Sequence, residues 1–161
     1  MANWVEPIFD RTEADVAFAK EQIRLWIEQV LTGNPIETYA LKGCLNVRDI
    51  NRIEGNIQYL GDRLKDLYYI SGVSCKTWTQ SGLPTEHDVL RIISNINLII
   101  TSFYRQKGTP DVPASMRTYT EINDIEENLL RIKQLLDHME KCFQKSGTFQ
   151  CGAKRMLPIR R

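Results

Sequence analysis

The chain has 161 residues, of which 42% are hydrophobic and 25% charged, the ordinary composition of a single globular domain. Its formal net charge of +1 argues against bulk nucleic-acid binding and against strong attraction to a membrane surface. Because no apolar run reaches the roughly 18 residues that span a bilayer, and Met1 to Phe9 lacks the pattern of a signal peptide, we expect folding in a cytoplasm.

Four segments each begin with an acidic residue followed by an apolar one, and apolar residues then recur at steps of three and four. This spacing places them on one face of a helix, a stripe that we call the seam. In chain order the seams begin with Val16, Ala19, Ile23, Trp26 and Val30; with Ile50, Ile53, Ile57, Leu60 and Leu64; with Val89, Ile92, Ile96 and Ile99; and with Ile122, Ile125, Leu129, Ile132 and Leu136. Seams of this kind pack helix against helix.

The ends of the segments carry helix signals. Three residues before each acidic anchor stands a capping residue, which is the spacing of a capping box: Thr12, Asn46, Thr85 and Thr118. Each segment is followed by a glycine able to close a helix: Gly33, Gly72, Gly108 and Gly147. We therefore predict helices over 13–31, 47–71, 86–107 and 119–146.

These elements predict an all-α protein, a four-helix bundle built from four related capped helices with extended N- and C-terminal arms. The bundle domain is residues 1–147, including an N-terminal arm over 1–10, and a basic arm follows over 148–161. The loops between the helices, at about 9 to 14 residues, exceed a minimal helix hairpin. Antiparallel neighbours are the default, but loops of this length are also able to cross over along a helix.

A polar residue stands seven positions after each anchor: Gln22, Asn56, Asn95 and Asn128. One interpretation is a layer of side-chain amides that sets the register of the helices. The other is four half-exposed amides at the rim of the bundle. The third segment is also apolar off its seam, at Leu90, Ile93, Leu98 and Ile100, so this helix is either central in the fold or meets another chain.

The two arms are the predicted partner-binding segments. Apolar anchors are expected at Trp4, Val5, Ile8, Phe9 and Phe149, and charge complementarity at Arg155, Arg160 and Arg161. The arm over 148–161 carries a charge of +4 without an acidic residue. It is either disordered in isolation or pairs with a partner.

The residue pattern of a catalytic or metal site is missing from the sequence. The four cysteines form no CxxC pair and have no histidine at ligand spacing, so we interpret them as reduced thiols, with a disulfide between Cys142 and Cys151 as the alternative. His87 and His138 are expected in solvated positions, and Glu126-Glu127 on a solvated helix face. We therefore expect no catalytic residue, no cofactor and no metal, and a protein that is not an enzyme.

Distinctive groups of residues occur along almost the whole chain. The first three are Asp10-Arg11-Thr12 with Asp15-Val16; Lys42-Gly43 and Leu45-Asn46 with Asp49, Asn51-Arg52-Ile53-Glu54, Asn56 and Tyr59-Leu60; and Trp78 with Pro84-Thr85, Asp88, Arg91-Ile92 and Asn95-Ile96. The last comprises Tyr119, Ile125-Glu126, Asn128-Leu129, Ser146-Gly147-Thr148-Phe149 and Gly152. Together they resemble a family of structural proteins from phages and prophages of Gram-positive (Firmicutes) bacteria, whose members are tail-, baseplate- or fibre-associated.

The resemblance implies a virion protein, made in the bacterial cytoplasm and placed in the tail or baseplate of a phage or phage-derived particle. Its partners would be other tail or baseplate proteins, it would be present in multiple copies, and it would bind neither nucleic acid nor membrane. Since no fibre or receptor-binding domain is appended, an adaptor, plug or decoration role is favoured over receptor recognition. The alternative is a cytoplasmic helical interaction module, an assembly chaperone or regulator that the particle does not retain.

Overall fold

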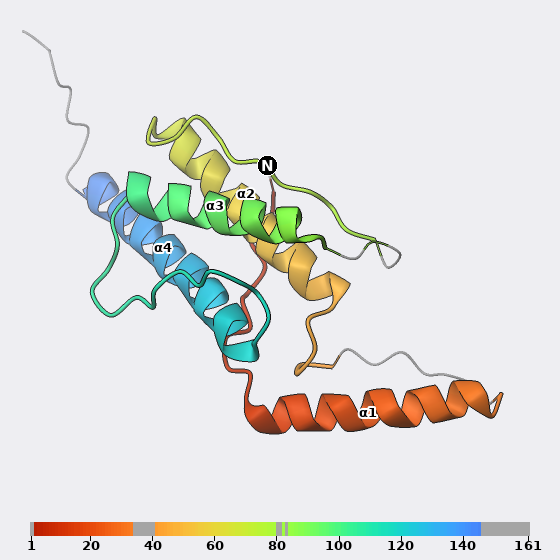
Figure 1. Cartoon of the computed structure of the whole chain (residues 1–161). Helices are drawn as coiled ribbons and strands as arrows, with labels where there is room; N and C mark the ends of the chain where they lie inside the picture. Colours follow the sequence, from red (N-terminus) through yellow and green to blue (C-terminus); the bar gives the residue numbers. More distant parts are fainter. Residues whose placement is uncertain (1, 34–40, 80–81, 83, 146–161) are drawn as a thin grey trace, which may run out of the picture.

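The computed structural model describes residues 2–33, 41–79, 82 and 84–145, and its helices are α1 (Glu13–Leu31), α2 (Val47–Asp66), α3 (Glu86–Ser102) and α4 (Tyr119–Lys145) (Figure 1). Within these ranges there is no strand, so the prediction of an all-α protein with four helices is confirmed. The start of every helix agrees with the prediction, whereas α2 and α3 end five residues earlier than expected. The segment over 148–161 lies outside the described residues.

All four capping boxes are present. Thr12, Asn46 and Thr85 each accept a hydrogen bond from the backbone of the acidic anchor, whose carboxylate accepts in turn from the backbone of the cap. At α4, Glu121 N–H donates to Thr118 Oγ1 at 3.2 Å, and Thr118 N–H donates to the Glu121 carboxylate at 2.8 Å. The caps satisfy backbone groups that lie within three residues, which explains why sequence spacing alone located them.

The carboxylate of Glu121 makes the start of α4 sensitive to pH. A hydrogen bond from Ser115 Oγ at 2.6 Å, aided by backbone N–H groups of Thr118 and Arg117, lowers its pKa from 4.5 to about 2. A lowered folded-state pKa stabilises the fold above pH 4.5, and this contribution is lost as the pH falls toward 2. We expect Glu121→Gln to cost up to about 1 kcal/mol at pH 7. Urea unfolding should show that the difference in the free energy of unfolding between variant and parent shrinks as the pH falls from about 5. A difference independent of pH would contradict this.

Helix α2 ends at Asp66 and is closed by Tyr68 rather than by the predicted Gly72. Tyr69 N–H donates to Leu64 O and Tyr68 N–H to Lys65 O, both at 2.9 Å, which is the Schellman pattern of a helix end. Tyr68 has φ +63°, the left-handed conformation that this pattern requires and that favours glycine.

We expect Tyr68→Gly to raise the free energy of unfolding by about 1 kcal/mol. The Tyr68 side chain is 96% exposed, so little packing is lost, while the strain of a side chain at positive φ is removed. Thermal unfolding of the variant beside Tyr69→Gly, which has no positive φ to relieve, checks this. A variant no more stable than the parent would contradict it.

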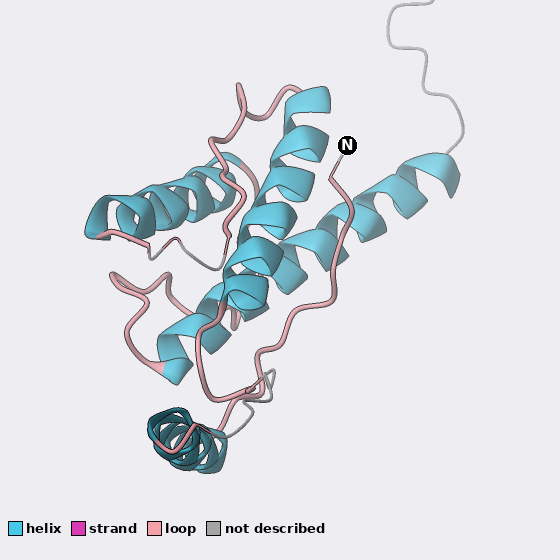
Figure 2. Ribbon diagram, turned by 90° about the vertical axis from the view of Figure 1, so that its right-hand side faces the viewer, coloured by secondary structure: helices cyan, strands magenta, loops and turns pink. Residues whose placement is uncertain are grey.

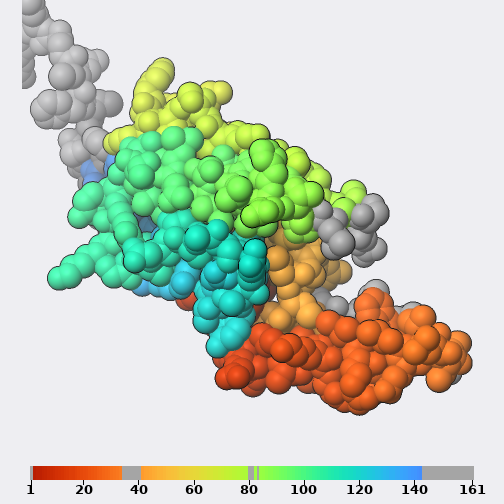
Figure 3. All heavy atoms as spheres, in the orientation of Figure 1, coloured from red at the N-terminus to blue at the C-terminus, as the bar shows by residue number. Residues whose placement is uncertain are grey.

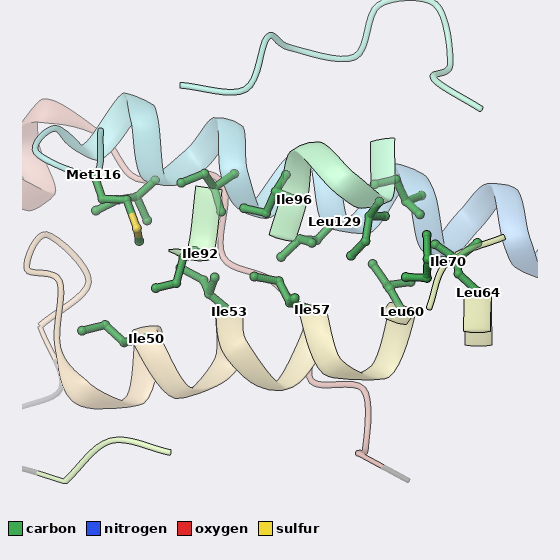
Figure 4. Close-up of a cluster of buried hydrophobic side chains, with 14 of the residues drawn as sticks. Ile50, Ile53, Ile57, Leu60, Leu64, Ile70, Ile92, Ile96, Met116 and Leu129 are labelled. Carbon is green, nitrogen blue, oxygen red and sulfur yellow. The ribbon is translucent and has the colours of Figure 1, made fainter. Parts of the chain in front are cut away.

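The hydrophobic core lies between α2, α3 and α4, as Figure 4 shows for 14 of its side chains. The seams of these helices supply its fully buried members, which include Ile53, Ile57, Leu60, Ile92, Ile96, Ile99, Ile125, Leu129 and Leu136. At the far end of the core, α3 stops at Ser102 because the chain turns at Phe103, whose ring packs edge-on against Tyr69 at a centroid distance of 5.2 Å. The half-buried Phe103 ring packs against the core at the point where the predicted helix would have continued to Gly108.

The three core helices run in the same direction, each from its Asn46, Thr85 or Thr118 cap toward the same end of the bundle (Figure 1). The default expectation of antiparallel neighbours is therefore wrong, and the alternative of crossover loops holds. The segments after α2 and after α3 return along the outside of the bundle to the end where the next helix starts. These connections are long because each has to travel back along a helix before the next helix starts.

Helix α1 lies outside the core, which corrects the expectation that all four seams pack together. Helix-to-helix packing in the described residues joins α2, α3 and α4, and α1 has no comparable contact with any of them. Figures 1 and 2 show α1 as a separate rod below the other three helices. Of its 19 residues only Ala19 is buried.

Candidate functional site

Three extended segments lie against the core helices, and we call them the first strap (residues 2–11), the second strap (71–79) and the third strap (104–116). The first strap runs along α2 and α4 toward the start of those helices (Figure 2). The second and third straps are the crossover segments that precede α3 and α4. The straps cover polar side chains that the helices carry beside their seams.

The first strap is held by two asparagine side chains that each bind backbone in both directions. Asn56 Oδ1 accepts from Val5 N–H at 3.0 Å, and its Nδ2 donates to Val5 O at 2.7 Å. Asn123 does the same to Arg11, accepting at 3.3 Å and donating at 2.9 Å. An amide that satisfies both backbone groups of one residue fixes the strap without reading its side chains.

Between these two clamps lies a buried cluster of charges. Glu126 is fully buried; its Oε1 accepts from Arg52 Nη2 at 2.6 Å and from Arg11 Nη2 at 3.0 Å, and its Oε2 accepts from Ile8 N–H at 2.6 Å. Asp49 Oδ1 accepts from the same two guanidinium groups, at 2.6 Å from Arg52 and 3.0 Å from Arg11. Two carboxylates thus neutralise two arginines across α2, α4 and the first strap.

The second strap is held by the same device. Asn95 accepts from Ser74 N–H at 3.3 Å and donates to Ser74 O at 2.7 Å. Asn51 accepts from Trp78 N–H at 2.8 Å and donates to Trp78 O at 2.9 Å. The helices supply these amides at the same offsets from their acidic anchors as at the first strap.

The second strap also has an equivalent charge cluster. Glu54 Oε2 accepts from Arg91 Nη1 at 3.0 Å and from Lys76 N–H at 3.3 Å, and Glu54 Oε1 accepts from the Trp78 indole at 3.1 Å. Lys76 Nζ forms an ion pair with Asp88, which lowers the pKa of that carboxyl. This cluster is therefore equivalent to the first one. Glu54 corresponds to Glu126, Arg91 to Arg52 and Asp88 to Asp49, and Lys76 takes the position of Arg11 as the cation from the strap.

The third strap is held by a weaker version of this arrangement. Asn128 Nδ2 donates to Pro110 O at 3.1 Å, but proline has no N–H to return, and the buried Asn128 Oδ1 has no partner among the described residues. The positions equivalent to Asn51 and Glu54 are taken by Leu90 and Ile93. Two of the four apolar residues off the seam of α3 are thus accounted for: Ile93 is buried, and Leu90 is exposed beside a shallow hollow.

The repeat is a strap followed by a helix, and it occurs three times in the described part of the chain. The second and third straps lead directly into α3 and α4. The first strap belongs to α2 by its contacts, but 35 positions separate Arg11 from the Asn46 cap. Helix α1 lies within that interval. It is therefore an insertion between the first strap and α2, and not a fourth copy of the repeat.

The start of α1 is held against the segment that leads into α2. Gly43 lies so close to the backbone of α1 that a Cβ atom at this position would be 2.0 Å from Asp15 O. Lys42 Nζ bridges Asp10 at 2.9 Å and Asp15 at 3.7 Å. The first half of α1 is therefore held, whereas the second half extends beyond the bundle (Figure 3).

The second half of α1 exposes large apolar side chains, which we call the α1 patch: Ile23, Trp26, Ile27 and Val30. Their exposed fractions are 37%, 40%, 54% and 52%. The spacing of three, four and seven places them on one helix face. The charged residues of this half are on another face and neutralise one another, since Arg24 binds Glu21 at 2.7 Å and Glu28 at 2.6 Å. A contiguous apolar face of this kind indicates an interaction site.

The predicted partner-binding residues of the N-terminal arm have two different placements. Trp4 and Ile8 are half-buried in contacts within the chain; the Trp4 ring lies 5.7 Å from the Tyr59 ring. Val5 and Phe9 are 51% and 39% exposed, although Val5 is clamped through its backbone. Phe149, Arg155, Arg160 and Arg161 lie outside the described residues. The arm is thus first an internal strap, which corrects its assignment as a free contact segment.

The predicted amides have a role other than a layer between helices. Asn56, Asn95 and Asn128 are buried, as the register interpretation requires, but each binds strap backbone. Gln22 is half-buried on α1, outside the core. Sequence reasoning also missed Glu126, which was expected to be solvated and is fully buried. Its signal was available, because Asn123 and Glu126 follow their anchor at the offsets of Asn51 and Glu54.

The remaining reactive side chains do not form a recognisable centre. His87 and His138 are exposed, and within the described residues no group of three or more histidine, cysteine or acidic side chains could hold a metal ion. Among the described helices none is long and apolar enough to cross a bilayer. The polar clusters described above bind the extended backbone of the straps through hydrogen bonds.

We expect thiol reagents to leave Cys75 unmodified in the folded protein. Burial, with Glu54 nearby, raises the pKa of the Cys75 thiol to about 12. Since the thiolate is the nucleophile, Cys75 should react only after unfolding. Iodoacetamide labelling with peptide mass spectrometry, in buffer and in urea, checks this. Early labelling of Cys75 in the folded protein would show that the second strap opens.

Comparison of the chain with protein-family models, with curated proteins and with solved structures finds no match in any of the three.

Proposed function

We propose that the chain is a structural adaptor of a tailed phage or a phage-derived tail-like particle, bound to neighbouring tail or baseplate proteins through α1. The observation that carries the binding role is the α1 patch, an apolar helix face presented outside a core that is complete without it. The particle is suggested by the sequence resemblance alone.

The distribution of polar contacts supports this proposal. The buried charge clusters and asparagine clamps of the described residues bind the backbone of the straps, so they make the bundle a rigid body. A rigid body with one projecting apolar helix suits an adaptor, because helix-in-groove contacts are a common mode of protein recognition. We infer no catalytic activity, cofactor or metal.

Mass spectrometry of purified particles from a strain that encodes the chain tests the proposal. We expect the chain to copurify with tail proteins at a constant ratio across a density gradient. A variant with Trp26→Glu and Val30→Glu should be lost from the particles, while Phe18→Glu, on a different face of α1, should be retained. If the unaltered chain is made but absent from particles, the assembly chaperone or regulator is the better account and the adaptor proposal fails.

A further inference from the structure

We propose that the α1 patch binds the α1 patch of a second copy of this chain, with the two helices antiparallel. This inference deepens the proposed function by naming one partner of the same surface, and it rests on that proposal only in taking α1 as the binding element. Three observations support it: the charge pattern of α1, the part of the helix that is free, and the position of the bundle.

The charge pattern makes the patch complementary to itself. Ile23, Trp26, Ile27 and Val30 share a face that Gln22 and Gln29 border on one side and Leu31 on the other, with the exposed Lys20 on that second side one turn before the patch. Glu21, Arg24 and Glu28 lie away from that face and are already paired. Two such faces can pack together without bringing like charges into contact. A partner that binds through charge would have no charged side chain on the patch to pair with. The flanking glutamines are able to hydrogen-bond to their counterparts across the pair.

The free part of the helix defines the overlap. Ala19 is 1% exposed and Gly43 lies against the backbone at Asp15, so the first half of the seam is covered by the chain itself. The exposed part centres near Ile27 and ends at Leu31, which is 80% exposed. A second copy therefore overlaps the second half of α1.

The position of the bundle decides the orientation. The bundle lies at the start of α1, and the end of α1 projects away from it (Figures 1 and 3). A parallel pair would bring two bundles together at one end, whereas an antiparallel pair places them at opposite ends. Ile27 then lies near Ile27 of the second copy, in a closed two-fold interface, the commonest kind in homo-oligomers.

Sedimentation velocity of the full chain tests this pairing. Each copy contributes only about two and a half helical turns, so we expect a dimer with a dissociation constant in the micromolar range. Ile27→Glu and Ile27→Lys, made separately, should each be monomeric at concentrations where the parent is a dimer. An equal mixture of the two should recover the dimer, because opposite charges then face each other at the centre of the interface.

The controls separate pairing from folding and from the virion role. Ile27 is more than half exposed, so both variants should keep the helical circular dichroism of the parent. Phe18→Glu alters a side chain 60% exposed on another face of α1 and should leave the dimer intact. A parent that stays monomeric up to about 1 mM, or an equal mixture that stays monomeric, would overturn the pairing. Presence of the chain in particles would in that case leave the adaptor proposal standing.

Discussion

Glu126→Gln should lower the free energy of unfolding by about 3 kcal/mol or more. The Glu126 carboxylate is fully buried and binds Arg11, whose side chain is 2% exposed, and Arg52, whose side chain is 9% exposed. A neutral amide leaves these two cations with Asp49 as their remaining anion. Because the cluster is buried, solvation replaces little of the lost pairing.

Two matched variants provide controls for the loss of stability expected at Glu126. Glu127→Gln, on the next residue, breaks an ion pair with Arg131 in which both side chains are about 30% exposed, and it should cost less than about 1 kcal/mol. Glu54→Gln removes the equivalent buried carboxylate, but its one arginine, Arg91, is 13% exposed, so an intermediate loss is expected. Urea unfolding at pH 7 measures all three. Equal losses at Glu126 and Glu127 would contradict the assignment of a buried cluster.

The second large effect is expected at Ile57. Ile57→Ala should cost about 2–5 kcal/mol, because this side chain is fully buried between the core helices and its truncation leaves a cavity. Ile23 stands at the same offset from its anchor in α1, yet it is 37% exposed. Ile23→Ala should therefore cost less than about 1 kcal/mol.

The pair tests where α1 lies, since the sequence makes Ile23 and Ile57 equivalent. Chemical unfolding of both variants, with helical content checked by circular dichroism, gives the two losses. A large loss at Ile23 in dilute protein would place α1 in a core with the other helices. A loss at Ile23 that grows with protein concentration would instead reflect pairing between copies.

The clamps explain how three parallel helices form a stable bundle. Parallel neighbours require each connection to travel the length of a helix, and an extended segment lying on a core has backbone groups that need partners. At the first and second straps, paired asparagines and a glutamate supply those partners. At the third strap Pro110 presents no N–H, and apolar Leu90 and Ile93 replace the polar pair.

Local features of the fold were accessible from the sequence. The capping boxes, the seams and the start of each helix depend on residues within one or two turns of one another, and each was predicted correctly. The end of α2 was not, because Tyr68 adopts a conformation that its residue type disfavours and that the surrounding turn imposes. Phe103 similarly ends α3 through a contact with Tyr69.

What only the tertiary structure decided is which seams are used and what the polar residues beside them hold. Four seams of the same spacing appear in the sequence, but three of them, with their straps, complete the core, and the seam of α1 is left largely exposed. The asparagines repeat visibly, yet their partners are backbone groups of Val5, Ser74 and Pro110, which carry no sequence signal. The candidate site follows from this long-range pairing, because only packing distinguishes a helix that completes a core from one that projects from it.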